Sequence, residues 1–266
     1  MSVTFMQKKR FYYIVRLQYL GFRFSGWQKQ PGQLTIERML IKTLKFILPE
    51  TPFKILGAGR TDAKVSSLDG AFELFVLEKE LPELAGFIDL FNTNLPSDIK
   101  VTGIIPTTSD FNIIQQSKSK EYVYLFSYGT KNHPFCAPFL TNIIAQLDIA
   151  LMQEATALFT GTHNFSSYTA KLQPNTKVIR TITNCTLAPN TLLKANFFPK
   201  ESYALTVNGA GFMRYQIRMM MGALFQVGKG ELSLDAIKES LTPNTNIVLT
   251  TVAPGSGLLL NKLTFD

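Results

Sequence analysis

The residues best placed to do chemistry lie in one glycine-bearing turn, residues 57–63, which reads Gly-Ala-Gly-Arg-Thr-Asp-Ala. The turn places the cation of Arg60 two residues before the carboxylate of Asp62. Glycine accepts backbone angles that other residues avoid, so the turn can present both side chains at an edge between two predicted strands. An aspartate in a turn also often caps the local backbone, and spacing alone leaves that simpler interpretation open.

The same turn does not fit the two common phosphate-binding patterns. A dinucleotide fingerprint needs a third glycine three residues after Gly59, and that position is Asp62. A P-loop ends in Gly-Lys followed by Ser or Thr, which the turn lacks. No nucleotide cofactor is therefore expected.

A second glycine-rich segment, residues 209–218, opens a predicted helix that carries Arg214 and Arg218. Residues four apart share one helix face, and the apolar residues 219–225 indicate that this helix is mostly buried. A buried guanidinium needs a carboxylate partner, because an unpaired buried charge is very costly. We expect Asp62 to be that partner.

A third segment, residues 118–124, predicts a strand with Tyr122 and Tyr124 on one face. Two such rings can belong to the core of an amphipathic strand, or one of them can stack on a nucleic-acid base. The pattern leaves both interpretations open.

The composition favours a folded protein with a polyanionic partner. The chain has 266 residues, a formal net charge of +8 and a pI near 9.4. A length of this order allows one large or two medium domains with a real core. Excess positive charge suits nucleic acid, because neutralised phosphates release counterions, although a basic soluble protein would show the same excess.

Metal, export and membrane signals are weak. Cys136 and Cys185 lie far apart, and neither His133 nor His163 stands at a zinc-ligand spacing. The apolar residues 219–225 are far fewer than the roughly 20 that span a bilayer, and no export signal is visible. We expect a cytoplasmic protein without a metal site.

Hydrophobic periodicity predicts strands and helices in a similar order in both halves of the chain. Strands are expected at 11–19, 53–57, 71–77, 99–105, 121–129, 178–188, 201–208 and 257–265. Helices are expected at 35–48, 82–91, 147–159, 212–227 and 233–241, with a polar loop at 161–175. This mixture predicts an α+β fold of two lobes. Lobe 1–105 would carry the Arg60/Asp62 turn, and lobe 106–266 would carry Tyr122 and Arg218.

Several of these segments together resemble the tRNA pseudouridine synthase A family. Arg60-Thr61-Asp62 is similar to the family's signature, and the other matches follow in the family's order along nearly the whole chain. They are Tyr19 with Gly21, Gly26-Trp27-Gln28-Lys29-Gln30, Thr35-Ile36-Glu37, Asn94-Leu95-Pro96-x-Asp98-Ile99, Lys120-x-Tyr122-x-Tyr124, Phe159-x-Gly161-x-His163-x-Phe165-Ser166-Ser167, and Gly211-Phe212-Met213-Arg214 with Arg218, Gly222, Val227-Gly228 and Gly230.

The resemblance implies an isomerase that converts uridine to pseudouridine in RNA, with tRNA and the 3′ side of its anticodon arm as the expected target. It implies two ferredoxin-like lobes with antiparallel sheets, joined around a central basic cleft. It also implies a homodimer. The reaction needs no metal, nucleotide or redox cofactor.

The resemblance also implies roles for individual residues. Asp62 would be the catalytic carboxylate, and Arg218 would keep it ionised by lowering its pKa. Tyr122 would stack on the uracil, since a phenol is a poor base at its ordinary pKa. Arg60 would fill the space left by the flipped-out nucleotide. RNA phosphates would be contacted by Lys29, Lys118, Lys120 and Arg214.

Some positions depart from the bacterial family pattern. Leu20, Lys64 and Ser66 replace an Asp, a Gly and a His. Ile114 stands where the family has an arginine, and Met219 where it has an asparagine. These departures leave two alternatives open: a divergent RNA-binding paralogue without activity, and a pseudouridine synthase that acts on another RNA, such as rRNA.

Overall fold

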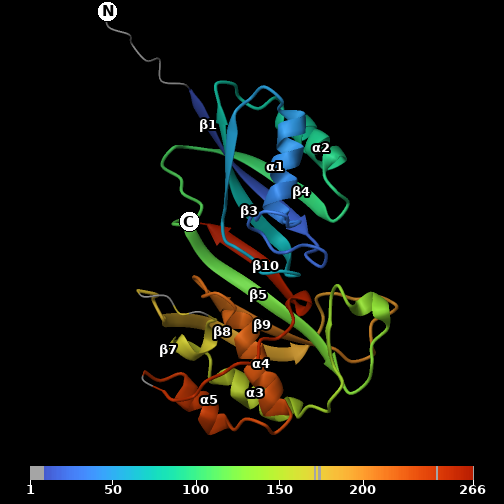
Figure 1. The fold of residues 1–266 in the computed structure, drawn as a ribbon, viewed down its shortest axis with the longest axis vertical. Coiled ribbons are helices and arrows are strands. Elements are labelled where there is room, and N and C mark those ends of the chain that lie inside the picture. Colours follow the sequence, from blue (N-terminus) through green and yellow to red (C-terminus); the bar gives the residue numbers. More distant parts are fainter. Residues whose placement is uncertain (1–8, 171, 173–174, 244, 266) are drawn as a thin grey trace, which may run out of the picture.

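The computed structural model describes residues 9–170, 172, 175–243 and 245–265 (Figure 1). It is a mixed α/β protein built on one ten-stranded sheet with the order β4-β1-β3-β10-β5-β9-β8-β7. Strand β2 pairs with β3 and strand β6 with β5, off this path. Most neighbouring strands are antiparallel, and the parallel pairs are β3 with β10 and β5 with β6.

The N-terminal half of the sheet is covered on one face by two helices (Figure 1). Its elements are β1 (Arg10–Tyr19), α1 (Ile36–Ile47), β2 (Phe53–Gly57), β3 (Ser66–Leu77), α2 (Leu84–Asn94) and β4 (Ile99–Thr107). The Thr35 hydroxyl caps α1 by accepting from the Arg38 amide. Leu40 and Leu44, one turn apart on α1, are fully buried with Phe72 of β3. This apolar stripe fixes the helix on the sheet.

Helices also pack beside the sheet of the C-terminal half (Figure 1). Its elements are β5 (Ser117–Tyr128), β6 (Thr141–Ile143), α3 (Ile149–Ala157), β7 (Gly161–Asn164), β8 (Ile179–Pro189), β9 (Tyr203–Gly209), α4 (Gln216–Gly228), α5 (Leu234–Ser240) and β10 (Leu258–Phe265). Short 3₁₀ turns lie at Pro134–Cys136, Ser166–Tyr168 and Gly255–Gly257. Met220 and Leu224 of α4 are fully buried in the core of this half with Phe126 of β5.

The last strand, β10, joins the two halves. It runs antiparallel to β5 and parallel to β3, where only Leu259 and Leu260 pair, with Ser66 and Ser67. Beyond these two paired residues, side-chain hydrogen bonds connect the N-terminal half to β10 at Leu263. Arg16 donates to the Leu263 carbonyl at 2.8 Å, and Asp69 accepts from the Leu263 amide at 3.0 Å.

The predicted mixture of helices with a mainly antiparallel sheet is confirmed, and the sheets of the two halves are continuous. The predicted polar loop 161–175 is wrong in its first part, which forms β7 at the sheet edge, while residues 171, 173 and 174 lie outside the described residues. The helix predicted from residue 212 begins at Gln216, because Tyr215 takes a left-handed backbone with φ of 64°.

Candidate active site

Asp62 lies on the turn between β2 and β3, and a preceding loop holds this turn in place. The Trp27 amide donates to the Thr61 carbonyl at 3.0 Å. Gly26 has a φ of +99°, and a Cβ built on it would lie 2.7 Å from the same carbonyl. Only glycine fits there without displacing the turn.

Arg218, near the start of α4, meets Asp62 from the other half of the sheet. Its Nη1 donates to Asp62 Oδ2 at 3.2 Å, and the two side chains are 15% and 23% exposed. Its Nε donates to the Ala253 carbonyl at 2.7 Å, which fixes the direction of the guanidinium. The expected pairing of Arg218 with Asp62 is confirmed.

Two opposing effects set the pKa of Asp62. Burial raises its pKa above the ordinary value, and the nearby charges of Arg218 and Arg214 offset only part of the rise. Arg218 lowers the pKa as expected, but the net shift is upward, because removing the carboxyl from water outweighs the attraction of the cation. The pKa of Asp62 depends on how much water reaches it and on how firmly Arg218 is held.

The Tyr122 ring of β5 packs edge-on against Phe212, with ring centroids 5.4 Å apart. Burial first, and the charge of Asp62 second, raise the pKa of Tyr122 to about 12. The phenol therefore stays protonated at neutral pH and is a poor base. Its geometry suits contact through the ring better than proton removal.

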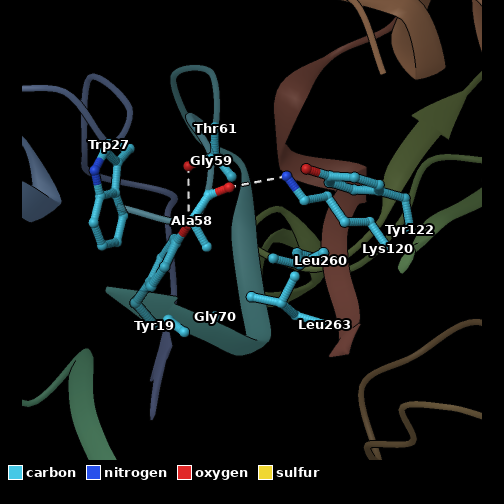
Figure 2. A pocket seen from close by; sticks show the side chains of 11 residues that line it. Tyr19, Trp27, Ala58, Gly59, Thr61, Gly70, Lys120, Tyr122, Leu260 and Leu263 are labelled. Atoms are coloured by element: carbon cyan, nitrogen blue, oxygen red, sulfur yellow. Dashed lines mark hydrogen bonds between the residues drawn. The ribbon is translucent and has the colours of Figure 1, made fainter. Parts of the chain in front are cut away.

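A pocket lies between Tyr122 and the turn that carries Asp62. Residues from both halves of the sheet line it (Figure 2). Its lining residues are Tyr19, Trp27, Ala58, Gly59, Thr61, Gly70, Ala71, Lys120, Tyr122, Leu260 and Leu263. The Tyr19 hydroxyl is 2.9 Å from the Thr61 hydroxyl. From the opposite wall, Lys120 Nζ donates to the Ala58 carbonyl at 2.9 Å (Figure 2).

The residues predicted to contact RNA fall into two groups. Arg60, Lys29, Lys118 and Arg214 are exposed. Arg214 lies close enough to lower the pKa of Asp62. Lys120 is half-buried instead and donates into the pocket wall.

Two features of the site were not predicted from the sequence. The Tyr215 ring lies beneath both guanidinium groups, with its centroid 5.0 Å from Arg214 Cζ and 4.9 Å from Arg218 Cζ. Such cation–π contacts order both arginines. A Cβ at Gly255 would lie 2.2 Å from the Ala63 carbonyl. The segment that leads into β10 therefore packs directly against the turn. The short Gly-Ser-Gly run at 255–257 was the available signal for this close approach.

Within the described part of the chain, no three His, Cys, Asp or Glu side chains gather as metal ligands. In the same residues, no helix combines the length and the apolar character needed to cross a bilayer.

Comparison with known proteins finds relatives that match this chain over most of its length. The family model described as tRNA pseudouridine synthase matches residues 155–266. Among curated relatives, tRNA pseudouridine synthase A from Streptococcus equi subsp. equi is 31% identical over 251 residues, covering 94% of this chain and 97% of that protein. The proteins of the same name from Thermodesulfovibrio yellowstonii and Geotalea uraniireducens are 30% and 31% identical, covering 94% and 92% of this chain and 97% and 95% of their own lengths. This chain belongs to the tRNA pseudouridine synthase A family.

Proposed function

We propose that the protein converts uridine to pseudouridine in tRNA. The observation that carries this proposal is the ion pair of Asp62 with Arg218, which stands close enough to Tyr122 for the charge of Asp62 to raise the tyrosine's pKa. A carboxylate, its cation and a facing ring suit an attack on the sugar of a stacked pyrimidine nucleotide. The curated relatives carry the name of this activity.

The reaction is an isomerisation, so no atom is gained or lost. The bond from uracil N1 to sugar C1′ breaks, the base turns, and C5 bonds to C1′. The proton on C5 leaves, and N1 ends protonated. Asp62 either adds to the sugar or stabilises the positive charge that develops there, and both roles need the carboxylate form.

The other site residues would bind and place the nucleotide. Tyr122 would stack on the uracil through its ring, because its protonated phenol is a weak base. The exposed Arg60, two residues before Asp62, would occupy the gap that the flipped-out nucleotide leaves in the RNA. Arg218 would both hold Asp62 and favour its ionised form.

The RNA would lie across a basic cleft between the two lobes, 1–105 and 106–266. Both halves have an order of elements compatible with ferredoxin-like lobes: β4-β1-β3-β2 in the first and β10-β5-β9-β8 in the second. Lys29, Lys118 and Arg214 are exposed and would contact phosphates. We place the target uridines on the 3′ side of the anticodon arm, and the protein in the cytoplasm as a homodimer.

The test is a map of pseudouridines in all RNAs of a strain that lacks this gene. Restoring the wild-type gene should return pseudouridine to tRNA, and restoring Asp62→Asn should not. Sites that return in rRNA instead would replace the tRNA assignment. A map that is unchanged by the deletion, together with RNA binding by the purified protein, would favour the non-catalytic alternative raised by Ile114, which is 57% exposed where the family has an arginine.

A further inference from the structure

Lys120 reaches from β5, in the C-terminal half, to the turn that carries Asp62 in the N-terminal half. Its Nζ donates to the Ala58 carbonyl at 2.9 Å, four residues before Asp62. The same ammonium approaches Gly59 so closely that a Cβ there would lie 3.1 Å from it. Figure 2 shows this contact crossing the pocket from one wall to the other.

The surroundings of Lys120 differ from those of a phosphate-binding lysine. Burial lowers its pKa, and no neighbouring carboxylate opposes that effect. Within the described residues, Lys120 forms no ion pair. An unpaired charge in a buried place costs stability. In a lysine that contacts RNA phosphate, the ammonium group would instead lie in solvent at the end of a flexible side chain.

Backbone hydrogen bonds hold the turn within the N-terminal half. Ala58 donates to the Ala71 carbonyl and Thr61 accepts from Trp27, and all of these residues lie in the N-terminal half. The C-terminal half reaches the turn through Arg218 at Asp62, through Gly255 against Ala63, and through Lys120. Lys120 thus supplies a hydrogen bond from that half at the start of the turn, where Ala58 also belongs to an apolar cluster with Ile113 and Leu263.

We propose that Lys120 is a positioning residue: by holding the Ala58 carbonyl across the pocket, it keeps the turn at the place where Asp62 meets Arg218 and the substrate. It does not serve as a phosphate contact. This inference rests on the proposed function, and it assigns to Lys120 a task different from the one expected by resemblance. A displacement of such a turn by about 1 Å can lower the catalytic rate by about 10²-fold.

The first test is Lys120→Met, which keeps the length and burial of the side chain and removes the donor. We expect kcat for pseudouridine formation to fall by about 10²-fold, while the Kd for tRNA and its salt dependence stay as in the wild type. Lys120→Arg restores a donor that can reach Ala58 and should recover most of kcat. Lys54→Met, an exposed lysine on β2, is the matched control for the lost charge.

A second readout needs no turnover. The Trp27 and Val65 amides donate to carbonyls of the turn, Thr61 and Asp62. Their hydrogen exchange in the RNA-free protein should be at least about tenfold faster in Lys120→Met and unchanged in Lys54→Met. If the wild type makes no pseudouridine, the proposed function fails, and amide exchange still decides the role of Lys120.

Two results would overturn the proposal. One is an unchanged kcat with weaker tRNA binding and a salt slope smaller by about one, which is the signature of a lost phosphate contact. The other is wild-type amide exchange and wild-type turnover in Lys120→Met.

Discussion

The guanidinium of Arg218 lies 3.2 Å from the carboxylate of Asp62, although 156 residues separate them in the chain. Asp62 lies on the turn of the N-terminal half and Arg218 on α4 of the C-terminal half, and Thr61, next to Asp62, lines the pocket that both halves enclose. Burial pushes the Asp62 carboxyl toward its neutral form, and Arg218 pulls it toward the charged form. The proposed activity depends on this balance.

Replacing Arg218 with Gln should lower kcat by about 10²–10³-fold, the usual cost of losing one electrostatic contact in an active site. Burial of Asp62 would then be opposed only by the exposed Arg214, so its pKa would rise further. Profiles of kcat against pH would check this: the acid limb of Arg218→Gln should lie at higher pH than that of the wild type. An unmoved acid limb would contradict the pairing.

The wild-type enzyme should lose activity as the pH falls through the raised pKa of Asp62, at a midpoint above the ordinary 3.8. Because the folded-state pKa lies above the unfolded value, ionised Asp62 costs stability, and this cost grows as pH rises through the interval between the two values. Asp62→Asn should therefore gain in Tm relative to the wild type between acid and neutral pH. A relative gain toward acid pH instead would show that Arg218 outweighs burial.

Lys64→Gly should stabilise the protein by about 0.5–1 kcal/mol and leave tRNA binding unchanged. Lys64 has a φ of 67°, in the left-handed region, and the family carries glycine at this position. Relief of the side-chain clash outweighs the extra freedom of glycine in the unfolded chain. Urea unfolding measures the change, with Lys64→Val as the opposite case, because a β-branched residue should lower stability there.

Gly255→Ala should slow catalysis more than it weakens RNA binding. Its Cβ would collide with the Ala63 carbonyl at 2.2 Å and push the turn away from Arg218. A loss in kcat of about 10²-fold is expected from such a shift. Gly103→Ala is the control, because a Cβ there meets nothing within 4 Å. Equal kcat in both variants would show that the turn does not depend on this contact.

Local sequence patterns predicted the elements well because most of them bury one periodic face. Helix α1 and strand β2 lie within one residue of their predicted ends. Strand β7 was missed because its four residues are held by pairing with β8, not by their own apolar pattern. The start of α4 was placed too early because the left-handed Tyr215 carries no glycine signal.

Part of the site was also predictable from the sequence. A buried arginine requires a carboxylate, and that rule led from Arg218 to Asp62. The sign of the Asp62 pKa shift could not be derived, because it depends on how much water the folded pocket excludes. The contact of Lys120 with Ala58 was also hidden, since a strand pattern does not reveal what a long side chain meets across the sheet.

The most direct measurement uses tRNA labelled with tritium at C5 of uridine, bound to excess protein in a single turnover. We predict that the wild type releases tritium to water as the C5 proton leaves, and that Asp62→Asn binds the tRNA equally but releases none. Release by Asp62→Asn at a rate near that of the wild type would contradict the central role of this carboxylate.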